Sequence, residues 1–179
     1  MRNVVTLLAV VVLGLPVVRA EDLAGEAIRL CEEAQQADAT TRDRMLERGL
    51  ELAEAAVAAD EHDARAHFAL FCVQARQVEA AGLSLGSMFI VRRLHRTVNR
   101  SLELNPDYVD ALVAKAGMLR RLPRLLGGDQ AEARRCLERA LALDPFHPVV
   151  RRYAVAEGLL AEEPVVFAGQ NEPAEPGWH

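Results

Sequence analysis

The chain has 179 residues, a length that suits one domain better than two. Hydrophobic residues make up 51% of it and aromatic residues only 4%, and most of the abundant types (Ala, Leu, Glu and Arg) cost little in a helix, so we expect an all-α fold. The formal net charge of −5 repels phosphate backbones and argues against a nucleic-acid partner.

Residues 1–20 have the pattern of a secretory signal peptide. Arg2 provides a positive start, residues 4–18 are almost wholly apolar, and residues 18–20 read Val-Arg-Ala before the expected cleavage point. The apolar run is shorter than the roughly 20 residues that a membrane-spanning helix needs. We therefore expect a periplasmic or secreted bacterial protein that begins at Glu21 and meets the membrane only transiently, through its signal peptide. An uncleaved N-terminal anchor is the alternative.

Apolar residues recur at helical spacing through residues 21–161, which we expect to form the folded domain. Thr40 and Asp43 resemble a capping box at the start of the second helix. The two glycines at 82 and 86 indicate a turn, and the composition of residues 162–179 is typical of a flexible tail. About seven helices are predicted, over residues 22–37, 40–60, 63–81, 88–104, 107–122, 129–143 and 148–161.

One type of helix ending recurs along the chain. Residues 104–106 read Leu-Asn-Pro, residues 143–145 read Leu-Asp-Pro, and residues 59–61 read Ala-Asp-Glu, so the endings lie 45 and 39 residues apart. Such recurrence predicts three stacked helical hairpins, an architecture that usually binds partners rather than catalyses reactions.

The last of these units resembles the tetratricopeptide repeat (TPR). Leu112, Ala116 and Leu119 match the large-small-large pattern of its first helix, and the second helix and its ending are matched by Ala133, Leu137, Ala140 and Pro145. The resemblance implies an all-α, right-handed stack of helical hairpins, a TPR-like α-solenoid. It also implies a protein or peptide partner on the concave face, where the expected contact residues are Arg65, Phe68, Asp110, Val113 and Arg120.

Residues 122–129 read Leu-Pro-Arg-Leu-Leu-Gly-Gly-Asp and resemble an element of the periplasmic TPR proteins associated with TRAP transporters. That resemblance implies a second possible function, an accessory role in organic-acid transport beside a solute-binding protein. The segment also offers a possible anion site at the start of the next helix, formed by Arg121, Arg124, Gly127 and Gly128. In the alternative interpretation the glycines only shape a loop and Asp129 caps the helix.

Chemical motifs are otherwise absent from the sequence. The five histidines have no metal-binding spacing and no nucleotide-binding or hydrolase motif occurs, so we predict no catalytic residue, no metal and no cofactor, and no enzyme. Arg92, Arg93, Arg96 and Arg100 form a basic stripe that is either solvated or a site for an acidic partner. The cysteines at 31, 72 and 136 are interpreted as small buried residues, although a secreted protein also permits one disulfide of unassigned pairing.

Overall fold

The computed structural model describes residues 20–82 and 87–161, and every regular element in these two ranges is helical. The predicted signal peptide (except Ala20), most of the predicted turn at 82–86 and the predicted tail (162–179) lie outside the described residues. A short 3-10 turn, η1 (Arg124–Leu126), lies between α5 and α6. The α-helices are α1 (Ala20–Glu33), α2 (Ala39–Ala59), α3 (Ala64–Ala81), α4 (Ser87–Leu104), α5 (Val109–Arg121), α6 (Gln130–Leu143) and α7 (Pro148–Ala156).

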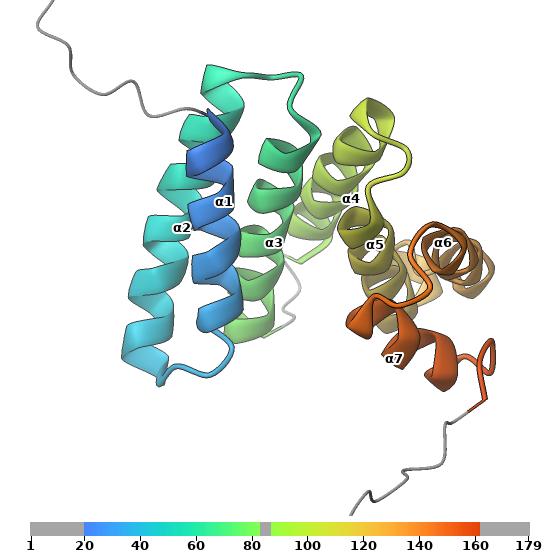
Figure 1. Cartoon of the computed structure of the whole chain (residues 1–179). Coiled ribbons are helices and arrows are strands. Elements are labelled where there is room, and N and C mark those ends of the chain that lie inside the picture. Colours follow the sequence, from blue (N-terminus) through green and yellow to red (C-terminus); the bar gives the residue numbers. More distant parts are fainter. Residues whose placement is uncertain (1–19, 83–86, 162–179) are drawn as a thin grey trace, which may run out of the picture.

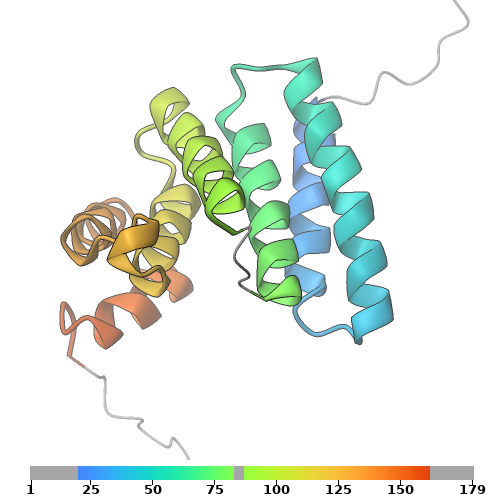
Figure 2. The same cartoon turned by 180° about the vertical axis from the view of Figure 1, so that it is seen from behind.

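Successive helices pair into three hairpins, which stack one after another (Figures 1 and 2). α1 packs on α2, α3 on α4 and α5 on α6, while α3 also packs on both helices of the first hairpin. The helix α7 covers the last hairpin at the opposite end from α1 and α2. The predicted all-α stack of hairpins with seven helices is therefore confirmed. None of the described helices combines the length and apolarity that a membrane crossing requires.

The three recurring helix endings contain the same type of hydrogen bond between a side chain and the backbone. At each ending the Oδ1 atom of an Asp or Asn accepts a hydrogen bond from the backbone N–H two residues further on, and the next helix begins four residues after that side chain. The distances are 2.9 Å for Asp60, 3.1 Å for Asn105 and 3.1 Å for Asp144. This local turn explains why the ending persists at Asp60 although Glu61 replaces the proline.

The predictions for the ends of α1, α2 and α7 need correction. α1 ends at Glu33 rather than at residue 37. The N-cap of α2 is Asp38, whose carboxylate accepts from the N–H groups of Thr40 and Thr41, so the proposed capping box of Thr40 and Asp43 is wrong. α7 ends at Ala156 rather than at residue 161, because Gly158 has a φ of +66° and the chain turns there.

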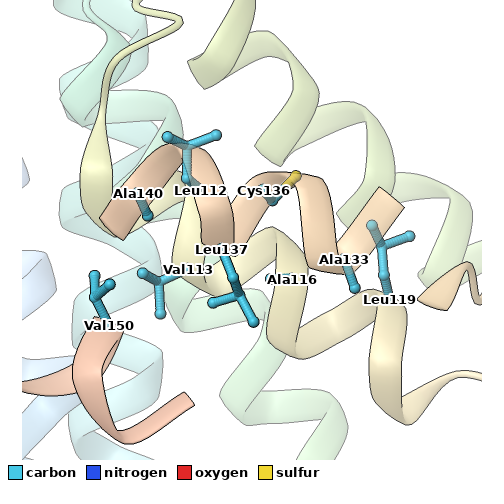
Figure 3. Close-up of a cluster of buried hydrophobic side chains, with 9 residues drawn as sticks. All are labelled: Leu112, Val113, Ala116, Leu119, Ala133, Cys136, Leu137, Ala140 and Val150. Atoms are coloured by element: carbon cyan, nitrogen blue, oxygen red, sulfur yellow. The ribbon is translucent and has the colours of Figure 1, made fainter. Parts of the chain in front are cut away.

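The hydrophobic core of the last hairpin lies between α5, α6 and α7 (Figure 3). The six apolar residues that the repeat pattern singled out on α5 and α6 are all buried in it. Small alanines at the contact positions let the two helices approach closely, while Leu137 fills the space that they leave. The cluster consists of Leu112, Val113, Ala116, Leu119, Ala133, Cys136, Leu137, Ala140 and Val150.

Candidate functional site

A cavity of about 320 Å³ opens beside the C-terminal half of α5, where α6 begins and α7 crosses. Its lining contains two cationic side chains, an amide, a phenol and a glycine. The lining residues are Gly117, Arg120, Arg121, Gln130 and Tyr153, and we call this cavity the α5–α7 pocket.

Arg120 is the more enclosed of the two arginines. Its side chain is 27% exposed, and Nη2 lies 2.6 Å from Oε1 of Glu157, just past the end of α7. Its guanidinium carbon stands 5.8 Å from the centroid of the Tyr153 ring, within the range of a cation–π interaction. The Nε2 atom of Gln130 donates a hydrogen bond to the backbone carbonyl of Arg120 at 3.2 Å. Arg120 is thus fixed in position by three neighbours.

Arg121 is the more accessible arginine, with 64% of its side chain exposed. It forms an ion pair with Glu79 near the end of α3, and its Nη2 lies 3.4 Å from the Tyr153 hydroxyl. Gly117 leaves room for this phenol, since a Cβ at that position would stand 3.2 Å from the hydroxyl oxygen. Side-chain contacts of Arg120, Arg121 and Tyr153 therefore link α3, α5 and the region of α7 at the pocket, and Gln130 adds α6.

Both guanidinium groups already form ion pairs with carboxylates of this chain. Glu157 pairs with Arg120, and Glu79 is shared between Arg121 and Arg76 of α3. An exposed ion pair is worth little, and the Arg121–Glu79 pair can exchange its carboxylate for one from another molecule at small cost. Arginine binds carboxylates through directed, charge-assisted hydrogen bonds, which makes this the natural ligand chemistry of the pocket.

The residues predicted for the concave face do not form one surface. Arg120 lines the pocket, but Arg65 is exposed beside Gly25 of α1, and Asp110 pairs with His147 at 3.1 Å. Phe68 and Val113 are buried, which corrects their expected role in contacting a partner. The reason is that Phe68 packs edge-on against Tyr108, at 5.0 Å between centroids, and Val113 belongs to the core beneath α7.

The predicted anion site is not formed. The N–H of Gly127 donates to the carbonyl of Arg124 and that of Gly128 to the carbonyl of Pro123, both at 3.0 Å, so neither points at a ligand. Asp129 is the N-cap of α6 and accepts from the N–H of Glu132 at 2.9 Å. The alternative interpretation of this segment, a loop followed by a capped helix, is the one that the structure supports.

Gly127 and Gly128 are each required at their positions for a different structural reason. Gly127 has a φ of +90°, and a Cβ there would stand 2.9 Å from Nε2 of His95 on α4. A Cβ on Gly128 would collide with the backbone carbonyl of Leu122. Burial and the charge of Lys115 lower the pKa of His95, which disfavours the charged form of the ring beside this loop.

Sequence reasoning missed the lining residues Gly117, Gln130 and Tyr153, and also Glu79 and Glu157, which pair with the two arginines. Tyr153 is one of only two tyrosines in the chain, but it lies on α7, which the repeat pattern treats as a covering helix. Glu79 lies 42 residues before its partner Arg121, and no local spacing predicts such a pair.

In the described residues, the basic stripe does not line the α5–α7 pocket, and the acidic side chains form no metal centre. Arg92, Arg93 and Arg96 are exposed, and Arg100 lies 3.4 Å from Glu103 on the same helix. Within residues 20–82 and 87–161 no three His, Cys, Asp or Glu side chains are grouped as a metal would require.

Comparison with known proteins adds one structural similarity. No family model and no curated protein matches the chain. A solved structure of the first TPR domain of Spaghetti (RPAP3), bound to the HSP90 peptide SRMEEVD, is similar over 76% of this chain and 94% of that chain, with 15% sequence identity and a TM-score of 0.46. The stacked-hairpin fold of this protein follows from its own helix contacts.

Proposed function

We propose that the protein is a non-catalytic scaffold that binds an acidic segment of a protein partner at the α5–α7 pocket. The observation that carries this proposal is the pair of intramolecular carboxylates on Arg120 and Arg121. Both guanidinium groups are oriented to hold a carboxylate, and the exposed one is reachable from solvent.

The arrangement supports a peptide ligand in particular. Two guanidinium groups stand over the Tyr153 ring, those of Arg120 at 5.8 Å and Arg152 at 5.7 Å from the ring centroid. An extended chain that crosses α3, α5 and α7 would place one acidic side chain on Arg121 in place of Glu79. The Tyr153 side chain, which lines the pocket, would offer such a chain an aromatic edge and a hydroxyl group.

Replacement of Arg121 by glutamine tests this function. In fluorescence polarisation with a labelled peptide of alternating glutamate and alanine, we expect the wild-type protein to bind and Arg121→Gln to bind about 10-fold to 100-fold more weakly, because a charge-assisted hydrogen bond is lost. The same peptide with glutamine in place of glutamate is expected to bind no better than the variant does.

The matched control is Arg134→Gln. Arg134 is an exposed arginine on α6 that forms an i,i+4 pair with Glu138 at 2.9 Å and does not line the pocket. Its replacement removes the same charge and should leave the affinity unchanged. Equal affinities of the two variants would show that only net charge matters and would refute the pocket.

We also propose that the protein acts outside the cytoplasm, as the pattern of residues 1–20 indicates. After expression of the full chain in a Gram-negative bacterium, intact mass measurement of the periplasmic fraction should give a protein that begins at Glu21. Recovery of the uncleaved chain from the cytoplasm alone would contradict export. The transporter-associated role has no observation in its favour beyond the resemblance of residues 122–129.

A further inference from the structure

Two of the three cysteines meet between the first two hairpins. Cys31 lies in the last turn of α1 and is 1% exposed, and Cys72 lies in the middle of α3, partly exposed. Both belong to the apolar cluster that joins α1, α2 and α3. Their sulfur atoms lie within hydrogen-bonding reach of each other, and both are free thiols here.

A cationic side chain accompanies this thiol pair. Arg76 lies one helical turn after Cys72 and interacts with both sulfur atoms, while its Nη1 is 2.7 Å from Oε2 of Glu79. The hydrogen bond from the Cys72 thiol and the charge of Arg76 hold the pKa of Cys31 below its ordinary value, against the opposing effect of burial. The hydrogen bond to Cys31 and burial raise the pKa of Cys72. The pair is thus asymmetric, with one thiol readier to react.

We propose that Cys31 and Cys72 form a reversible intrachain disulfide that ties α1 to α3. This inference is independent of the peptide-binding function. Cys31 is buried, so its reaction with an external disulfide would require a transient local opening of the last turn of α1. The remaining cysteine, Cys136, is buried in the separate core of α5, α6 and α7.

The oxidant is a low-molecular-weight disulfide, and the reaction is thiol–disulfide exchange. The Cys31 thiolate attacks one sulfur of oxidised glutathione, which forms a mixed disulfide and releases one glutathione. Cys72 then loses its proton to solvent and attacks the Cys31 sulfur, which breaks the mixed disulfide and releases the second glutathione. Two protein thiols are oxidised, and one molecule of oxidised glutathione is reduced to two thiols.

The disulfide would close the loop that contains all of α2 and fasten the first hairpin to the second. A bond that closes a long loop restricts the unfolded chain, so the oxidised protein should melt at a higher temperature. The expected rise is about 5 to 10 °C for a domain of this size.

Thiol mapping of the full chain tests the proposal. The protein is equilibrated with oxidised glutathione, its remaining thiols are alkylated in denaturant, and its peptides are analysed by mass spectrometry without reduction. We expect a linked peptide that contains Cys31 and Cys72, a mass lower by two hydrogens, and alkylation of Cys136 alone. Dithiothreitol should restore three alkylated cysteines and abolish the rise in melting temperature.

Three variants sharpen the result. Cys136→Ser should form the disulfide as the wild type does, Cys72→Ser should stop at the mixed disulfide with glutathione on Cys31, and Arg76→Gln should form the disulfide several-fold more slowly at pH 7.5. Three alkylated thiols in the oxidised wild-type protein, or a bond that involves Cys136, would overturn the proposal. The mapping of the wild-type chain decides this even where a variant fails to fold.

Discussion

Replacement of Gly128 by alanine is expected to cost roughly 3 to 5 kcal/mol of unfolding free energy, a loss at the upper end of what single substitutions cause. A Cβ at this position would stand 2.7 Å from the carbonyl carbon of Leu122 and still closer to its oxygen. Both are backbone atoms and cannot rotate aside. The whole loop after α5 would have to move, and the hydrogen bond from the Gly128 N–H to Pro123 would be lost with it.

Urea unfolding followed by circular dichroism measures this loss, with Gly158→Ala as the control. Gly158 has a φ of +66°, but no atom lies within 4 Å of the place that a Cβ would take, so alanine there adds backbone strain alone. That strain costs about 1 to 2 kcal/mol. Equal losses for the two variants would mean that the close contact with Leu122 does not hold the loop.

Replacement of Leu137 by alanine is the second change with a large expected effect. Leu137 is fully buried on α6 between α5 and α7, and its removal leaves a cavity in the core shown in Figure 3. Buried leucines cost about 3 to 4 kcal/mol when truncated in this way, because transfer free energy and packing are lost together. The same urea titration should show the midpoint falling while the slope stays constant.

Leu125→Ala is the matched control for that experiment. Leu125 lies in η1 and is 88% exposed, so the same chemical change there should alter the stability by less than about 0.5 kcal/mol. A comparable loss at both leucines would contradict the division between the core of α5, α6 and α7 and the loop above it.

Local chemistry explains why the helices could be predicted so fully. Their endings at Asp60, Asn105 and Asp144 depend on a hydrogen bond that spans two residues, and such a bond is visible as a residue type at a position. The capping residue Asp129 and the alanines of α6 could likewise be identified from the sequence. Each of them acts within its own helix or against the helix beside it. The capping box at Thr40 failed because Asp38, two residues earlier, caps the helix and accepts from the Thr40 N–H that Asp43 was expected to bond.

The exposure and contacts of the predicted site residues could not be derived from local sequence patterns. Phe68 and Val113 were predicted at the surface, yet Tyr108 covers the first and α7 the second. The glycines at 127 and 128 matched an anion-binding pattern, but the loop folds back so that their N–H groups meet carbonyls three and five residues earlier. The burial of Phe68 and Val113 depends on how far one helix slides and turns against the next, whereas short-range hydrogen bonds within the loop occupy the N–H groups of the two glycines.

By itself, the sequence of this protein determined the helices, their endings and the pairing into hairpins, because periodicity, capping and turn chemistry act over a few residues. Only the tertiary structure decided which faces stay open, that Tyr153 and Glu79 join Arg120 and Arg121, and that Cys31 meets Cys72. These partners lie on different hairpins or on the covering helix, and their distances follow from side-chain packing across the whole stack.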